Sequence, residues 1–157
     1  MTNKEIKIAF KEYDSLDQME TSDMELAKAA VEAMELSYAP YSNFNVGAAV
    51  RLEDGEIVKG ANQENAAYPS GLCAERTAMF YAGASRPDKA MTGIAIAAGQ
   101  NGKLTDTPAT PCGACRQVMA QYQLKGGRPM EVIMVGASRI WKFDKVDDIL
   151  PLIFDSI

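Results

Sequence analysis

The sequence of 157 residues contains no histidine, the side chain that most often serves as a catalytic base or a metal ligand. Any acid–base chemistry must therefore use Glu, Asp, Lys, Tyr or Cys. Only three cysteines are present, and this odd number does not suggest a disulfide framework. The first 14 residues (MTNKEIKIAFKEYD) do not resemble a signal peptide, because charges interrupt every apolar pair.

Long apolar runs and basic runs are also missing. No apolar run approaches the ~18–20 residues that are needed to cross a bilayer. Sixteen Lys and Arg against 21 Asp and Glu give a net charge of −5. An acidic chain without a basic stripe is a poor binder of polyanions, which argues against nucleic acid but not against a small uncharged molecule. We therefore expect a cytoplasmic protein that acts on neither membranes nor nucleic acid.

The length is that of one domain, and a hydrophobic fraction of 47% is enough for a core. Helical spacing and short uncharged apolar runs alternate along the chain, which favours an α/β fold: a three-layer α/β/α sandwich with a mixed β-sheet. We interpret residues 1–21 as an N-terminal extension that adds an edge strand, and residues 22–157 as a single catalytic domain. Strands are predicted at 5–10, 46–52, 57–58, 93–98, 131–136 and 138–143, and helices at 23–37, 73–83, 113–124 and 146–154.

All three cysteines fall in two short pieces of sequence. Cys112 and Cys115 have the C-x-x-C spacing that lets two thiolates hold one metal ion, and Cys73 begins the piece C-A-E-R. Each piece is placed at a predicted helix start, where the helix dipole lowers a thiol's pKa and favours the thiolate that binds zinc.

A lone C-x-x-C is often a redox pair or half of a structural zinc site. A structural zinc usually takes four Cys or His ligands, whereas this chain offers three cysteines and leaves a position for water. A redox pair would leave Cys73 and Glu75 unexplained. A ligand-x-Glu piece followed by Pro-Cys-x-x-Cys matches the signature of zinc nucleobase deaminases, in which Glu75 would transfer protons, with Cys73 in the place of a histidine.

The chain resembles the small cytidine deaminase family over roughly residues 22–155. The resemblance is carried by SYAPYSNFNVGAAV (37–50), GANQENAAYPSGLCAERTA (60–78) and PCGACRQVM (111–119). It implies a homotetramer with one Zn²⁺ per chain, held by Cys73, Cys112 and Cys115. It also implies hydrolytic deamination of cytidine or deoxycytidine in pyrimidine salvage, in which activated water attacks C4 of the base while Glu75 moves protons to N3 and to the departing amine.

The resemblance also implies roles for other residues. The Asn and the first Glu of N-x-E-N bind the ribose hydroxyls in that family, and the aromatic of P-Y-S-x-F packs against the pyrimidine. The backbone after the first cysteine reads the base edge, and an aromatic near the C-terminus reaches a neighbouring subunit's site. An Arg and a Gln lie beside the ligand cysteines. The corresponding residues are Asn62, Glu64, Phe44, Ala74, Phe154, Arg76 and Gln117, in that order.

Three alternatives stay open at this stage. The site could deaminate another aminopyrimidine such as blasticidin S, although the pair Asn62 and Glu64 argues for a ribose. The zinc could also be non-catalytic, against which Glu75 and the three-ligand count argue. Core packing remains an alternative role for Phe154.

Overall fold

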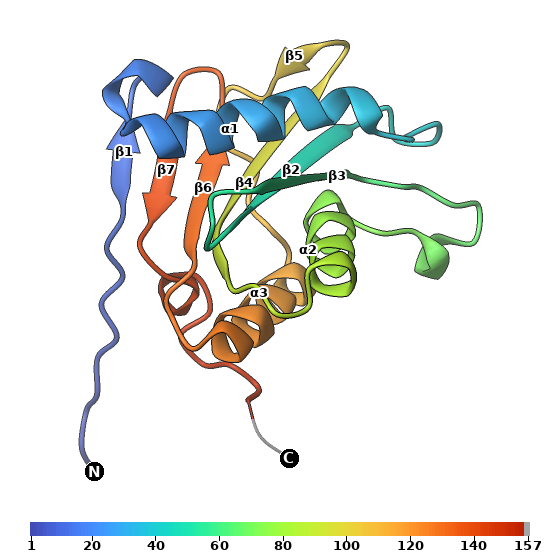
Figure 1. The fold of residues 1–157 in the computed structure, drawn as a ribbon. Helices are drawn as coiled ribbons and strands as arrows, with labels where there is room; N and C mark the ends of the chain where they lie inside the picture. The colour runs from blue at the N-terminus through green and yellow to red at the C-terminus, as the bar shows by residue number, and fades with distance from the viewer. Residues whose placement is uncertain (156–157) are drawn as a thin grey trace.

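The computed structural model describes residues 1–155, which form one mixed β-sheet with helices on both faces (Figure 1). The strand order is β1-β7-β6-β4-β2-β3, and β5 pairs with β4. The strands are β1 (Lys11–Tyr13), β2 (Asn45–Leu52), β3 (Ile57–Ala61), β4 (Met91–Gln100), β5 (Lys103–Leu104), β6 (Glu131–Val135) and β7 (Ile140–Phe143). The α-helices are α1 (Thr21–Ala33), α2 (Ala74–Ser85) and α3 (Gly113–Gly126). The predicted three-layer α/β/α sandwich is confirmed.

Helix α1 covers one face of the sheet, whereas α2 and α3 cover the other (Figure 1). Two glycines let the helices approach the strands. A Cβ at Gly47 in β2 would lie 2.1 Å from the carbonyl oxygen of Ala30 in α1, and a Cβ at Gly60 in β3 would lie 2.4 Å from the amide nitrogen of Ala78 in α2. The contact at Gly60 fixes the height of α2 above the sheet, and with it the position of the residues at the N-terminus of that helix.

The centre of the sheet is the parallel pair β4 and β6, while every other pair is antiparallel. Both strands are almost wholly buried, as sequences without a charge after Glu131 predict for strands covered on both faces. Helix α3 forms the crossover between them, so its N-terminus lies beyond the end of β4. None of the helices in residues 1–155 is long and apolar enough to span a membrane.

Several predicted element boundaries are wrong. Residues 5–10 are not a strand; the edge strand β1 follows them and pairs with β7. Residues 146–154 do not form an α-helix but a single 3₁₀ turn, Val146–Asp148, because Pro151 cannot continue a helix. Helix α2 runs through Gly83 to Ser85.

The start of α1 also differs from the expectation. The helix begins at Thr21, two residues before the predicted start, and no side chain caps it. Its α-helical part ends at Ala33, after which Met34–Leu36 form a 3₁₀ turn. Helix α3 ends at Gly126, two residues after the predicted end, and Gly127 follows it in a left-handed conformation at φ 63°.

Candidate metal centre and active site

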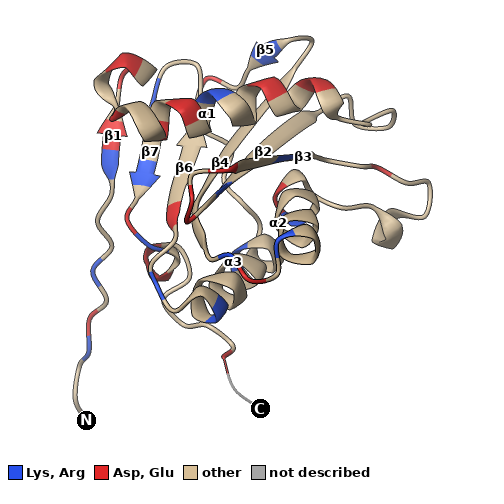
Figure 2. Ribbon diagram, viewed as in Figure 1, with Lys and Arg blue, Asp and Glu red and all other residues tan. Residues whose placement is uncertain are grey.

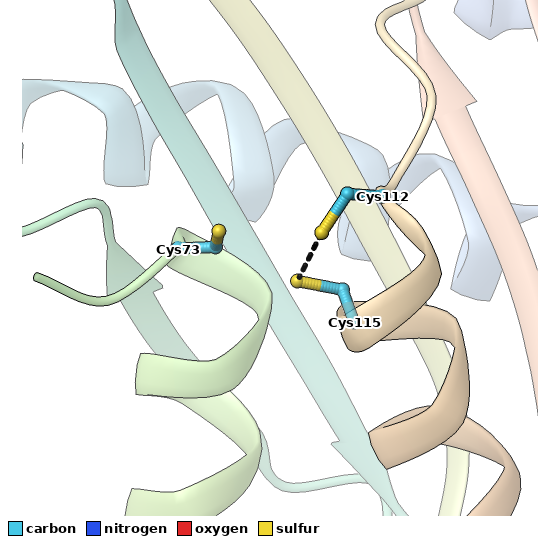
Figure 3. Close-up of side chains that lie close together, drawn as sticks. All are labelled: Cys73, Cys112 and Cys115. Carbon is cyan, nitrogen blue, oxygen red and sulfur yellow. Dashed lines mark hydrogen bonds between the residues drawn. The ribbon is translucent and has the colours of Figure 1, made fainter. Parts of the chain in front are cut away.

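Two helix N-termini bring the three cysteines together (Figure 3). Cys73 precedes α2 and Cys112 precedes α3, while Cys115 lies in the first turn of α3. The three sulfur atoms lie within 4.8 Å of one another, and the Sγ atoms of Cys112 and Cys115 are 3.7 Å apart. Helix dipoles at both N-termini stabilise negative charge at this point.

The electrostatics of the cluster favour a thiolate at Cys73. Its hydrogen bond with Cys115 lowers the pKa of Cys73 to about 5 against the opposing effect of burial, and the guanidinium of Arg76 adds to the lowering. The Nη2 atom of Arg76 lies 3.6 Å from the Cys73 Sγ. The same bond to Cys73, together with burial, raises the pKa of the Cys115 thiol. The cluster therefore carries negative charge that a divalent cation would neutralise.

Glu75 lies in the first turn of α2 and is 5% exposed. Burial raises the pKa of its carboxyl above the ordinary range, and the negative charge of Cys73 acts in the same direction. A raised pKa makes a carboxyl more ready to take up a proton than an ordinary glutamate is. Glu75 is thus the candidate for the acid–base group of this site.

A cavity of about 570 Å³ opens in front of the cysteines. Five residues that were predicted to bind substrate or to transfer protons line this cavity: Phe44, Asn62, Glu64, Ala74 and Glu75. Two of the three cysteines, Cys73 and Cys112, line it as well. Tyr41, Ser42, Tyr68 and Thr110 also line it, and the sequence reasoning gave them no role. Tyr41 and Ser42 stand inside the block P-Y-S-x-F, which was the available signal.

Asn62 and Glu64 are engaged with the loop that carries Phe44. The amide oxygen of Asn62 accepts hydrogen bonds from the backbone of Val46 at 2.8 Å and from Ser37, and its Nδ2 donates to the carbonyl of Phe44 at 2.8 Å. The carboxylate of Glu64 accepts from the hydroxyl of Ser42 and from the Tyr41 backbone at 2.9 Å. The Ser42 hydroxyl and these amides lower the pKa of Glu64. Both residues therefore shape the cavity wall that they line.

Phe154 and Gln117 lie outside this cavity. Phe154 is 67% exposed, so core packing within its own chain does not account for it. The side chain of Gln117 donates to the Phe154 carbonyl at 2.7 Å and accepts from its amide at 3.2 Å. Gln117 thus holds the backbone of the C-terminal segment, which differs from the expected place beside the ligand cysteines.

The donor set fits zinc. Three thiolates suit a soft or borderline divalent ion, and a tetrahedral ion with three protein ligands keeps one position for water or substrate. The guanidinium of Arg76 contacts the Cys73 Sγ through Nη2 and keeps a positive charge close to the sulfurs. Three thiolates at two helix N-termini, with a buried carboxylate facing a cavity, define a zinc hydrolase site.

Comparisons with known proteins agree with this class. Residues 20–126 match the family described as the cytidine and deoxycytidylate deaminase zinc-binding region. Cytidine deaminase of Halalkalibacterium halodurans is 49% identical over 96 residues, which are 61% of this chain and 68% of that protein.

Solved structures agree as well. The cytidine deaminase of Burkholderia pseudomallei superposes with a TM-score of 0.71 at 39% identity and covers 83% of this chain and 97% of its own. That of Mycobacterium tuberculosis has a TM-score of 0.65 at 32% identity over 84% and 96% of the two chains. The chain belongs to the cytidine and deoxycytidylate deaminase zinc-binding family, and its three cysteines bind one zinc ion.

Proposed function

We propose that this protein hydrolyses the exocyclic amine of cytidine and deoxycytidine to give uridine or deoxyuridine and ammonia. The observation that carries the proposal is Glu75, a buried carboxyl beside the three-cysteine cluster at the base of a cavity of about 570 Å³. The cavity is the size of a small-molecule site. Membership of the deaminase family supports the reaction class.

The residues divide the work of this reaction. Zinc supplies a Lewis acid that makes water a competent nucleophile near neutral pH. Glu75 takes one proton from the attacking water and passes it to N3 of the base as the water oxygen bonds to C4. Glu75 then moves the second proton of that oxygen to the amine at C4, so that the C4–N bond breaks and ammonia leaves. The backbone of Ala74, at the cavity wall between Cys73 and Glu75, faces the base edge, and Phe44 packs against the ring.

Asn62 and Glu64 recognise the ribose in this proposal. Both residues line the cavity. The Glu64 carboxylate accepts a hydrogen bond from Ser42 and has further oxygen lone pairs that can accept from a ribose hydroxyl. Asn62 has a second role, because three hydrogen bonds tie it to the strand and loop around Phe44 and Val46. We therefore expect Glu64→Gln to weaken nucleoside use selectively and Asn62→Ala to weaken both nucleoside use and folding stability.

The comparison of cytidine with free cytosine checks these two roles. Loss of hydrogen bonds at part-buried Asn62 costs roughly 1–3 kcal/mol, so Asn62→Ala should also lower the midpoint of urea unfolding. For Glu64→Gln we expect kcat/KM to fall on cytidine while any turnover of cytosine stays the same. Equal losses on both substrates would show that Glu64 serves only to hold Ser42 and Tyr41.

The proposed assembly is a cytoplasmic homotetramer that serves pyrimidine salvage. Phe154 supports an assembly with sites at subunit contacts, because it is exposed and lies outside the cavity of its own chain. Gln117 fixes its backbone, which would let the aromatic ring reach a neighbouring subunit at low entropic cost. Sedimentation of the purified protein tests the tetramer, and Phe154→Ala should reduce activity without changing the zinc content.

The decisive experiment is an absorbance assay of the zinc-loaded protein on cytidine, deoxycytidine and blasticidin S, with zinc measured in the same sample. We expect turnover of both nucleosides with close to one zinc per chain. Turnover of blasticidin S alone would reassign the substrate. A metal-loaded protein without turnover of any of the three would leave a non-catalytic zinc module.

A further inference from the structure

The segment before β1 is an extended arm with apolar side chains in water. Residues 4–12 run down one side of the molecule, past the end of β7, and the outer edge of β1 has no partner strand within residues 1–155 (Figure 1). Ile6, Ile8 and Phe10 are 57%, 53% and 50% exposed. The arm lies before residue 20, where the match to the family begins. An unpaired edge that continues into exposed apolar residues is a template for pairing with another chain.

Two contacts fix which way the arm's side chains face. Phe10 stacks on Phe143 with ring centroids 5.1 Å apart and meets the edge of Trp141 at 5.8 Å. The indole of Trp141 donates to Glu12 at 2.6 Å. Phe143 belongs to the core on the α2 and α3 side, so even-numbered residues of an extended arm lie on that side of the sheet. Ile8 and Ile6 therefore continue the apolar row that Phe10 begins.

We propose that residues 4–12 of two copies of this chain pair as antiparallel strands about a two-fold axis at Ile8, which joins their sheets edge to edge. In this register Ile8 faces its own copy, and Ile6 faces Phe10. The charged residues are complementary as well: Lys4 faces Glu12, and Glu5 faces Lys11. Figure 2 shows basic and acidic residues interspersed along the arm.

The charge pattern singles out this register. Opposed residues share a face in an antiparallel pair, so an axis through any residue keeps the even residues on one face, and the registers nearest to Ile8 have their axis at Lys7 or Ala9. An axis at Lys7 places that lysine against its own copy and Phe10 against Lys4. An axis at Ala9 sets Lys7 against Lys11 and Ile6 against Glu12. Like charges directly opposite destabilise a sheet, so the axis at Ile8 is favoured.

The intramolecular contacts of the charged residues leave room for this pairing. Lys11 meets Asp144 at 3.6 Å, but the two side chains are 60% and 70% exposed, and such pairs contribute little. Glu12 is bound by Trp141 and lies 3.7 Å from Arg139, which holds its carboxylate at the edge where Lys4 of the second copy would arrive. A second copy of the chain therefore completes both the apolar row and the ionic row.

Cysteine placed on the axis tests the proposal in the zinc-loaded full-length protein. Ile8→Cys brings two thiols opposite each other, within reach of a disulfide, whereas Ile6→Cys places them four residues apart in register and out of reach. The two positions match in residue type and exposure, so each controls for the other. After mild oxidation we expect Ile8→Cys to form a covalent dimer at least about tenfold faster than Ile6→Cys and the parent protein. Equal rates, or no dimer at Ile8→Cys, would overturn the pairing.

Charge reversal in the Ile8→Cys background is the second part of the test. Glu5→Lys sets lysine against Lys11 and should reduce the rate of dimer formation several-fold. Glu5→Lys combined with Lys11→Glu restores opposite charges between the copies and should recover the rate. A double variant no better than the single one would contradict the proposed register even if the dimer forms. Deaminase activity is an independent reading, since no residue of the arm lines the cavity.

Discussion

Each face of the sheet buries a cluster of ionisable groups, and the two clusters are built in opposite ways. Under α1, Asp23, Arg51, Glu131 and Lys142 form a ring of alternating charge. Lys142 Nζ contacts Asp23 and lies 2.7 Å from Glu131, while Arg51 lies 3.0 Å from Asp23 and 2.5 Å from Glu131. Under α2 and α3, Glu75 and three thiols lie beside the cation Arg76. One cluster balances its charge within the chain, and the other does so only with a metal ion.

The pKa shifts express the same difference. Burial alone would raise the pKa of Asp23 and lower that of Lys142, but their hydrogen bonds outweigh burial, so Asp23 is lowered and Lys142 is raised. Both stay charged in the folded protein. For Glu75 burial prevails, and its pKa is raised. A buried group whose charge is compensated by a partner stays ionised and contributes to stability. A buried group whose pKa is shifted toward its neutral form is suited to proton transfer.

The largest effect is expected on kcat when the carboxylate of Glu75 is removed. Glu75→Gln keeps the size of the side chain and should retain zinc and the fold, but it cannot accept a proton. One acid–base residue contributes about 10²–10⁴-fold, and since Glu75 serves several proton transfers in the proposed mechanism we expect kcat to fall by about 10⁴ or more. Steady-state assays with zinc analysis check this.

Glu25→Gln is the matched control, because Glu25 is an exposed glutamate on α1 and should leave kcat unchanged. Turnover of Glu75→Gln within about tenfold of wild type would show that another group carries the protons.

Breaking the balanced cluster should affect stability and leave chemistry alone. Lys142→Met leaves Asp23 and Glu131 with Arg51 as their only cation, and removing one partner of a buried ion pair costs about 3–5 kcal/mol. We expect the midpoint of urea unfolding to fall accordingly, with kcat of the folded protein unchanged. Lys59→Met, at an exposed pair with Glu32, is the control and should change stability little.

A double variant sharpens this test. Asp23→Asn together with Lys142→Met removes one charge of each sign and leaves Arg51 paired with Glu131. The loss of stability should then be smaller than the sum of the two single losses, because each single variant strands a buried charge. Strict additivity would show that the ring is not a coupled unit.

The metal centre was easier to read from sequence than the ion ring, and the reason is local spacing. Cys112 and Cys115 lie one helical turn apart, and Glu75 follows Cys73 by two residues. These short spacings indicate a zinc site with an acid–base residue directly from the sequence. The four members of the ring come from α1, β2, β6 and β7, and no spacing in the sequence relates them. Only the strand register brings Lys142 and Glu131 under Asp23.

The fold shows the same division. Apolar runs, uncharged apart from Glu131 at the start of β6, predicted β4 and β6 because both faces of these strands are buried. The alternation at residues 5–10 reads as a strand, but no partner strand within residues 1–155 lies beside it. The segment 146–154 has apolar residues at helical spacing, yet Pro151 ends any helix there and Arg116 binds the carbonyl of Ile149 at 2.9 Å instead.

A smaller effect is expected from the cation at the metal centre. Arg76→Ala removes the guanidinium that lies 3.6 Å from the Cys73 Sγ. Groups that hydrogen-bond to metal ligands typically change affinity 10–100-fold when they are mutated. We expect zinc affinity, measured by competition with a chromophoric chelator, to fall within that range. Arg86→Ala, which removes an arginine paired with Glu56 at the far end of α2, should leave zinc affinity unchanged. An unchanged affinity in Arg76→Ala would mean that the helix dipoles alone stabilise the thiolates.

The smallest effect is expected on how the stability of the Asp23 and Lys142 cluster depends on pH in the acid range. The pKa of Asp23 is lower in the folded protein than in the unfolded chain. The stability that this group contributes is therefore fully present above its unfolded pKa, near pH 4, and is lost as the pH falls through the lower folded value. We expect urea midpoints measured from about pH 6 to pH 3 to fall less steeply in Asp23→Asn than in wild type. Asp88→Asn, at an exposed position, should keep the wild-type slope. Because Lys142 has a raised pKa, its contribution is lost only as the pH rises through that value, so it stays constant over this acid range. Equal slopes for wild type and Asp23→Asn would mean that protonation of the Asp23 carboxylate does not cause the loss of stability in acid.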